Sequence, residues 1–200
     1  GQPVPAGVDG AIVVKLPLPP GSLPTLWNDD ARFVASYLSA YDGYYLTGDS
    51  GHIDEDGYVY VMGRTDDVIN VAGHRLSTGS MEEALAAHPD VAECAVIGVA
   101  DPLKGQVPRG FVVLKAGATR DPREVEAELV RLVRERIGAV ASLKEVAVVA
   151  ALPKTRSGKI LRKTMRGIAD GVDEPIPSTV DDPSVIESLR PLLHRPDHTG

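Results

Sequence analysis

The clearest hydrophobic pattern along the chain lies in residues 121–138. Five apolar residues recur there at the spacing of one helical face: Val125, Leu129, Leu132, Val133 and Ile137. Asp121 can cap the first turn, Pro122 suits the first helical position, and Gly138 is a typical residue to end a helix. The pattern therefore predicts an amphipathic helix with one buried face.

Short apolar runs on either side of this helix predict buried strands. They are residues 91–99, 110–114 and 145–152. Residues 66–77 have the pattern of a strand, a glycine turn and a second strand, whereas 78–88 and the basic stretch 159–169 predict helices. From about residue 66 the order is strand–strand–helix–strand–strand–helix–strand–helix, which is typical of an α+β domain.

The N-terminal third has a different pattern. Residues 9–15 predict a strand, 16–27 a Pro-rich extended loop, and 30–41 a helix. The pair Asp56-Gly57, followed by an alternating apolar run, predicts the turn of a β-hairpin. This part is predicted to be the end of a separate domain.

We therefore expect three parts. They are residues 1–65, the β-rich end of one domain; 66–170, the α+β domain; and 171–200, an extended Pro-rich tail with a short helix laid on the surface. Because the chain opens at Gly1 without a methionine, in strand-like sequence, we expect it to be a fragment or a trimmed chain.

Composition narrows the function classes. The chain has 200 residues, 43% of them apolar, and a formal net charge of −7, which argues against general nucleic-acid binding. The one cysteine, Cys94, lies in an apolar run and is predicted to be a core residue. With no intrachain disulfide, no signal peptide and no membrane-spanning run in the sequence, a cytoplasmic location is expected.

The sequence around Ser50, "GDSGH", raises the question of a serine hydrolase. No histidine precedes Ser50, and His52 stands where a nucleophile elbow needs glycine, so this function is rejected. A calcium loop centred on Gly57 would put His52 and Gly63 at its first and last ligand positions, which also fails. The stretch "TRSGKI" lacks the spacing of a phosphate loop, and no metal site is predicted.

Three stretches together carry a stronger signal. They are "YLTGD" (45–49), "GRTDDVINVAGHRLS" (63–77) and "LPKTRSGKILRK" (152–163). In this order and spacing they resemble the last three signature motifs of the adenylate-forming acyl-CoA synthetases, over essentially the whole chain. The stretches "LPLPPG", "NVAGHRLSTG", "DPLKGQVP" and "STVDDPS" are similar to the propionate–CoA ligase branch, near acetyl-CoA synthetase.

The resemblance implies a fold and an activity. The fold would be the small α+β C-terminal domain of these enzymes, a three-stranded sheet with helices plus a two-stranded ribbon, preceded by the β-rich end of the large N-terminal domain. The family converts a carboxylic acid and ATP to an acyl-adenylate and pyrophosphate, and CoA then displaces AMP. The implied cofactors are ATP, Mg²⁺ and coenzyme A, with acetate or propionate as the substrate.

The resemblance also implies nucleotide-binding residues. Asp49 would bind the ribose hydroxyls with the help of Arg64, Arg75 would lie near the phosphates, and Lys159 would be the catalytic lysine of adenylation. An Asp in a Thr-Gly-Asp turn is, taken alone, more often a plain turn former.

The remaining implied residues concern the hinge and CoA. Asp66 would be the hinge, Gly73 would leave room for the pantetheine arm, and Arg134 would contact a CoA phosphate. A structural explanation stands beside each: Asp66 can form a turn, Gly73 can serve a positive φ, and Arg134 lies on the polar side of an amphipathic helix.

Charge supports the role of Lys159. Six basic residues and no acidic one lie between Lys154 and Arg166, in an acidic chain. Adenylation brings a carboxylate to a polyphosphate, so a mobile ammonium on a Ser-Gly loop can neutralise the charge as the bond forms. For Arg162, Lys163 and Arg166, a solvated helix face is an equally good explanation.

The family's phosphate-gripping loop, acyl pocket and adenine-binding segment are not found in the chain. We therefore expect the missing N-terminal domain to be a partner that supplies most of the Mg²⁺ site, and the fragment alone to be inactive. The resemblance also implies reversible acylation of the family's lysine, so a lysine acetyltransferase and a deacetylase acting on Lys159 are further expected partners, whereas nucleic acid and membrane are not. The alternatives are a non-catalytic regulatory or binding module that retained the fold, and an amino-acid-adenylating domain.

Overall fold

The computed structural model describes residues 2–172 and 176–194 of the chain. It divides between Asp66 and Asp67 into two compact units, which we call unit 1 and unit 2 and describe separately. Among the described residues, no helix combines the length and the apolar character needed to cross a membrane.

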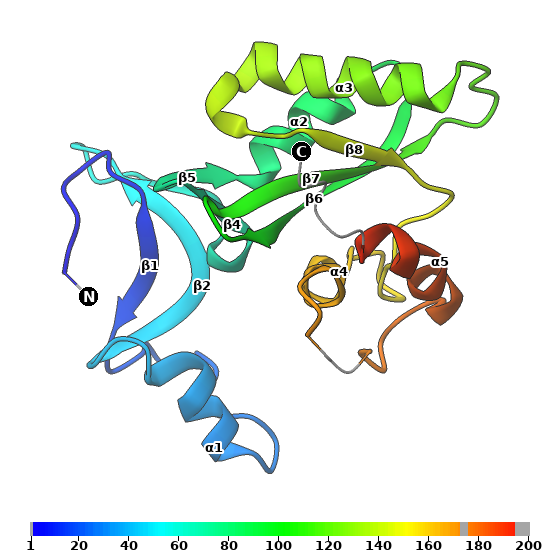
Figure 1. Cartoon of the computed structure of the whole chain (residues 1–200). Helices are drawn as coiled ribbons and strands as arrows, with labels where there is room; N and C mark the ends of the chain where they lie inside the picture. Colours follow the sequence, from blue (N-terminus) through cyan, green and yellow to red (C-terminus); the bar gives the residue numbers. More distant parts are fainter. Residues whose placement is uncertain (1, 173–175, 195–200) are drawn as a thin grey trace. The chain divides into compact units, whose positions relative to one another are not determined.

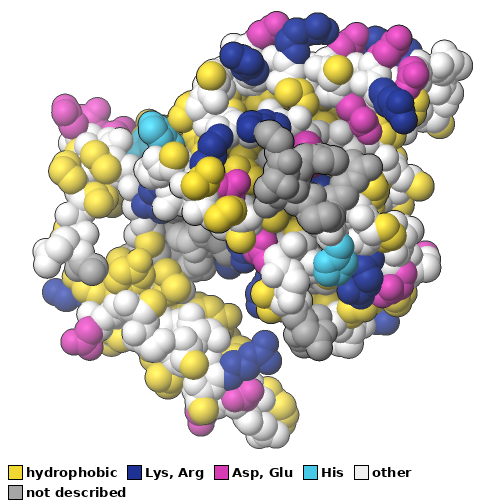
Figure 2. Space-filling model, in the orientation of Figure 1, with side chains coloured by type: hydrophobic (Ala, Val, Ile, Leu, Met, Phe, Trp, Pro, Cys, Tyr) yellow, Lys and Arg dark blue, Asp and Glu magenta, His cyan; other side chains and the backbone are white. Residues whose placement is uncertain are grey.

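Unit 1 is built on an antiparallel sheet of three strands in the order β1-β2-β3. The strands are β1 (Gly10–Lys15), β2 (Tyr44–Ile53) and β3 (Val59–Arg64). The predicted hairpin is confirmed, because β2 pairs with β3 and Gly57 in the turn has φ +87°. Apolar side chains next to and along β3 are exposed: Tyr58, Val59, Tyr60, Val61 and Met62. Figure 2 shows hydrophobic atoms, in yellow, on the surface of this unit.

The helix predicted for residues 30–41 is shorter and less regular than expected. Helix α1 (Asp30–Phe33) runs directly into a π-helical segment, Val34–Leu38. The side chain of Asp29 caps α1 by accepting a hydrogen bond from the Arg32 amide, 3.1 Å away. The buried ring of Phe33 packs against Tyr37 of the same segment and against Tyr45 of β2, which fixes the segment on the sheet.

Unit 2 contains a five-stranded sheet in the order β5-β4-β7-β6, with β8 paired to the other edge of β7. The strands are β4 (Val68–Val71), β5 (His74–Ser77), β6 (Val91–Asp101), β7 (Gly105–Leu114) and β8 (Glu145–Val148). Strands β4 and β5 form a ribbon, and β4 pairs with β7 at Val71–Gly105. The α+β fold expected from the sequence is thereby confirmed.

Helices cover both faces of this sheet, as Figure 1 shows. They are α2 (Thr78–Ala86), α3 (Pro122–Ile137), α4 (Arg162–Ala169) and α5 (Pro183–Leu193). Alternate residues of each strand point to opposite faces, so Val96 and Val112 join the core under α2 and α3. Ile97 and Phe111 join a second core under α4 and α5. In Figure 2 the outer side of α3 carries a mixture of basic and acidic side chains.

The C-terminal segment differs from the expectation of a tail on the surface. Helix α5 begins after Asp182, whose carboxylate accepts a hydrogen bond from the Ser184 amide, 2.8 Å away. Ile186, Leu189 and Leu193 recur on one helical face and are almost completely buried in the second core. The segment is therefore part of unit 2 rather than an attachment to it.

Two element boundaries also move, and one of them concerns the candidate site. Strand β8 ends at Val148, and α4 begins at Arg162 instead of residue 159. Lys159 consequently lies in the loop between these elements, where its backbone makes no helical hydrogen bonds.

We predict that Leu189→Ala destabilises unit 2 by about 2–5 kcal/mol, because it removes a buried side chain from the second core. Hydrogen exchange of the central amides of β6 and β7 measures this loss. Ser188→Ala, exposed on the neighbouring position of α5, is the matched control and should stay within about 0.5 kcal/mol of wild type. Equal exchange in both variants would show that α5 does not belong to the core.

Candidate functional site

In unit 1 the structure brings Asp49 and Arg64 together. They are directly paired residues on β2 and β3, and the Arg64 Nη1 atom lies 3.6 Å from the Asp49 Oδ1 atom. Arg64 Nη1 also donates to the carbonyl of Thr47 at 3.4 Å. Both side chains remain partly exposed, 48% for Arg64 and 38% for Asp49, so the carboxylate can still accept hydrogen bonds from a ligand.

Gly48 is a site residue that the sequence reasoning missed. Its φ is +83°, and a β-carbon there would lie 2.7 Å from both terminal guanidinium nitrogens of Arg64. Only glycine adopts this conformation without strain and leaves this space. The signal in the sequence was the glycine directly before Asp49, in "LTGD".

The hydrolase reading of Ser50 finds no support in the structure. Ser50 is 5% exposed, and its hydroxyl donates to the Gly63 carbonyl, 3.4 Å away. The His52 Nδ1 atom is 2.9 Å from the Asp9 carboxylate instead. Ser50 therefore belongs to the packing of the β2–β3 pair.

The predicted hinge residue, Asp66, lies in the short 3₁₀ turn Thr65–Asp67, where the two compact units divide. Gly73 follows β4 in the turn to β5 and has φ +86°, with nothing within 4 Å of an added β-carbon. The positive φ is a sufficient reason for glycine at this turn. Arg75 is exposed on β5, opposite Asn70.

Arg134 lines a pocket of about 310 Å³ beside the C-terminal end of α3. Lys104 and Lys144 also line this pocket, and the Lys104 Nζ atom donates to the Ser142 hydroxyl at 3.3 Å. The backbone carbonyl of Lys104 accepts a hydrogen bond from Ala72, which ties the Gly73 turn to Lys104. The sequence reasoning missed both lysines because they lie outside the helix that carries Arg134, and only the fold brings them to its side.

Lys159 lies on a tight, exposed loop between residues 154 and 160. Thr155 donates its amide to the Lys159 carbonyl at 2.8 Å, and the Thr155 Oγ1 atom accepts from the Lys159 amide at 3.1 Å. Gly158, with φ +83°, closes the turn by donating to the Thr155 carbonyl. These bonds hold the backbone of Lys159 while its ammonium remains accessible to solvent.

Ion pairs hold both ends of this loop. The Lys154 Nζ atom lies 2.6 Å from a carboxylate oxygen of Glu93. Arg162 makes a bidentate pair with Glu82, with both nitrogen–oxygen distances 2.8 Å. The sequence did not decide whether Arg162 is structural or functional. This ion pair assigns it a structural role.

Cys94 fits the expectation of a core residue. Burial, together with the negative charge of Glu82, raises the pKa of its thiol to about 11. A thiol with this pKa stays protonated at neutral pH and is a poor nucleophile.

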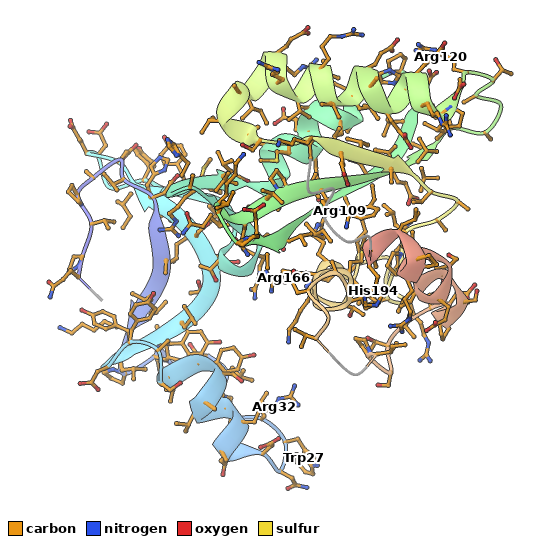
Figure 3. The ribbon with its side chains drawn as sticks, in the orientation of Figure 1. Trp27, Arg32, Arg109, Arg120, Arg166 and His194 are labelled. Atoms are coloured by element: carbon orange, nitrogen blue, oxygen red, sulfur yellow. The ribbon has the colours of Figure 1, made fainter. Side chains whose placement is uncertain are left out.

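His88 is likewise structural. It is 7% exposed, its Nδ1 atom accepts from the Asp90 amide, and its Nε2 atom therefore donates to Glu128, 3.2 Å away. Arg120, labelled near the start of α3 in Figure 3, makes a bidentate pair with the same carboxylate. Hydrogen bonds from Arg120 and then His88 lower the pKa of Glu128 from 4.5 to about 2.

We predict that the interactions of Glu128 with Arg120 and His88 make the stability of unit 2 depend on pH. Because the pKa of Glu128 is lower in the folded chain, its stabilising contribution is complete above about pH 4.5 and is lost as the pH falls toward 2. Urea midpoints measured from pH 5 to 2 should fall less steeply in Glu128→Gln than in wild type. Glu135→Gln, exposed at the other end of α3, should keep the wild-type slope; identical slopes in all three chains would contradict the assignment.

Among the described residues, no group of three or more His, Cys, Asp or Glu side chains is placed to hold a metal ion. The site residues thus form three local groups: the Asp49–Arg64 pair with Gly48, the Arg134 pocket with the Gly73 turn, and the Lys159 loop. The first offers an acceptor to hydroxyls, and the other two offer cations to anionic groups.

Comparison with known proteins gives the class of this chain. Residues 80–159 match the family of AMP-binding enzyme C-terminal domains. The chain contains such a domain, and over most of its length it is homologous to short-chain acyl-CoA synthetases and propionate–CoA ligase.

Individual relatives give the extent of the similarity. An uncharacterized protein of Pseudomonas aeruginosa is 60% identical over 96% of this chain and 31% of its own length. The mitochondrial acyl-CoA synthetase short-chain family member 3 of Homo sapiens is 48% identical over 92% of this chain and 27% of its own length. The propionate–CoA ligase of Escherichia coli is 46% identical over 96% of this chain and 32% of its own length. The chain thus spans about a third of these relatives.

Solved structures agree with the fold. ATP-bound MatB from Rhodopseudomonas palustris matches with a TM-score of 0.69 and 30% identity, over 85% of this chain and 32% of that protein. The o-succinylbenzoate CoA synthetase of Bacillus subtilis, in complex with an acyl-adenylate, matches with a TM-score of 0.66 and 30% identity, over 82% and 31%.

We predict that Gly48→Ala displaces the Arg64 side chain and destabilises unit 1 by about 1–3 kcal/mol through backbone strain and the steric conflict together. Gly57→Ala is the matched control, because it has a similar φ of +87° but open space around an added β-carbon. NMR of the Arg64 guanidinium should show a change in Gly48→Ala alone. The same change in both variants would mean that contact with Arg64 is not what requires glycine at 48.

Proposed function

We propose that the chain is the C-terminal part of an AMP-forming short-chain acid–CoA ligase that activates propionate or acetate. The observation that carries the proposal is the position of Lys159 on an exposed loop whose backbone is held by hydrogen bonds. The chain that contains this loop is 46% identical, over 96% of its length, to a propionate–CoA ligase. The bound ATP would supply the phosphorus that the acid attacks, with pyrophosphate as the leaving group.

Asp49 and Arg64 would hold the nucleotide. The carboxylate of Asp49 can accept hydrogen bonds from two neighbouring ribose hydroxyls, and Arg64 lies beside it to orient it. Gly48 fits this role, because the space that its missing side chain leaves is needed by the guanidinium of Arg64.

Lys159 would stabilise the charge that develops in adenylation. Its ammonium is compact and solvent-accessible, and the loop backbone is fixed, so the charge can be brought to the reacting phosphate without reorganising the loop. Acetylation of Lys159 would remove this charge and block the step, which is why an acetyltransferase and a deacetylase are proposed partners.

Arg134, Lys104 and Lys144 would bind the phosphates of CoA. Three basic side chains around one pocket favour a polyanion more strongly than a single arginine on a helix does. The pocket borders the C-terminal end of α3, and Lys159 precedes α4. These two helices cover opposite faces of the sheet (Figure 1). This separation is consistent with two reaction steps that use different faces of unit 2, with Asp66 as the hinge and Arg75 near the phosphates.

The described residues do not fit a Mg²⁺ site, since they offer no carboxylate cluster. We therefore assign no step to Mg²⁺, and propose that its ligands belong to the larger part of the enzyme.

The half-buried thiol of Cys94 is compatible with the proposed cytoplasmic location.

We predict that acid-dependent ATP–pyrophosphate exchange in the whole ligase falls about 10²–10³-fold in Lys159→Ala, because one preorganised charge at the transition state is removed. Lys163→Ala, an exposed lysine on α4, is the charge-matched control and should stay near wild type. Conversion of supplied acyl-adenylate and CoA to the thioester should continue in Lys159→Ala.

The acid dependence of the exchange identifies the substrate among acetate, propionate and butyrate. This chain alone should give no exchange with any of them. Exchange above background with one acid would show that a complete nucleotide site lies within these residues, and unchanged exchange in Lys159→Ala would overturn the catalytic assignment.

A further inference from the structure

We propose that residues 178–181 are a positioning element for Lys159, and that helix α5 holds this element in place. The inference rests on the catalytic role proposed for Lys159. From the sequence alone, these residues were predicted to be part of an extended tail.

Residues 178–181 lie along the outer edge of the Lys159 loop and pair with its backbone. The Arg156 amide donates to the Thr179 carbonyl at 3.0 Å, and the Asp181 amide donates to the Lys154 carbonyl at 2.9 Å. Between these bonds, Thr155 and Val180 form an antiparallel bridge. The loop therefore has a backbone partner on its outer side as well as its own turn bonds.

The loop needs this partner because, apart from its own turn bonds, little else holds it in place. Residues 156–159 are exposed, so no hydrophobic burial holds the tip. The ion pairs Lys154–Glu93 and Arg162–Glu82 fix only the two ends. An isolated two-stranded turn is marginally stable in water, and a third paired segment is the usual way to stabilise it.

Residues 178–181 are in turn held by the second core. Val180 is 8% exposed and packs in the same cluster as Met165 of α4 and Ile186 of α5. This packing connects the outer strand of the loop directly to both helices on that face of the sheet.

Arg109 fixes the far end of α5. Its guanidinium lies in the region between β7 and α5 in Figure 3 and donates to the carbonyls of Leu192 and Leu193, at 2.8 and 3.0 Å. These carbonyls belong to the last turn of the helix, where a cation is favourable. The side chain is only 12% exposed, so α5 is docked by a largely buried polar contact in addition to its apolar face.

The chain of contacts therefore runs from β7 through α5 and residue 180 to the backbone of the loop. A catalytic side chain must be held close to its productive geometry, and loops need support from neighbouring elements for this. Loosening residues 178–181 would leave Lys159 chemically intact but badly positioned.

The test uses two substitutions at one position. Asp181→Pro removes the amide that donates to Lys154, whereas Asp181→Ala keeps it and is the matched control. Hydrogen exchange of the Arg156, Gly158 and Lys159 amides in this chain should be about tenfold faster in Asp181→Pro, the factor expected for about 1.4 kcal/mol from one lost hydrogen bond. Asp181→Ala should match wild type, and α3 amides should not change.

Val180→Ala keeps the test decisive if the proline variant does not fold. It shortens the buried side chain without removing a backbone hydrogen bond, and should give a smaller increase confined to the same loop amides. Unchanged loop exchange in the folded variants would overturn the proposal.

Activity of the whole ligase then separates positioning from simple stability. In Asp181→Pro, ATP–pyrophosphate exchange should fall about tenfold, in proportion to the loss of loop order, while thioester formation from supplied acyl-adenylate stays within about twofold. A loosened loop with full pyrophosphate exchange would overturn the positioning role. Full exchange in Lys159→Ala would instead refute the proposed function, while the hydrogen-exchange comparison still decides whether residues 178–181 hold the loop.

Discussion

The alternation of side chains along β6, β7 and β8 is the constraint on which unit 2 depends. Apolar residues occupy both faces of these strands, so each face must be covered, and α2 with α3 cannot do this alone. Helices α4 and α5 complete the burial. The same constraint separates the candidate residues, because Arg134 lies on a helix of one face and Lys159 precedes a helix of the other.

Polar side chains join these layers at the edges of the sheet. Glu82 of α2 accepts a hydrogen bond from the Val96 amide on the open edge of β6 and pairs with Arg162 of α4. Glu126 of α3 accepts from the Val148 amide on the edge of β8 in the same way. These carboxylates satisfy edge amides that would otherwise be available for pairing with another chain. One of them also fixes the helix that follows the Lys159 loop.

The basic cluster near the C-terminal end shows how a uniform charge pattern divides into different roles. Lys154 and Arg162 are ion-paired to carboxylates from distant parts of the sequence, so their charges are used in holding the loop. The ammonium of Lys159 extends from a loop whose backbone is held by hydrogen bonds with Thr155. The sequence alone does not distinguish these residues, because it does not show which carboxylates lie next to them in the folded chain.

Local patterns were sufficient for much of this protein: the order of elements in unit 2, the capped helix α3 and the β2–β3 hairpin follow from short-range spacing. The candidates Asp49, Arg64 and Lys159 came from the resemblance of three motifs to a known family. Tertiary structure alone decided the requirement for Gly48, the lysines around Arg134 and the burial of α5. Each of these depends on contacts between different elements of secondary structure. The spacing of residues along the chain determines local secondary structure. The neighbours of a residue in space depend instead on how all the elements pack around the core.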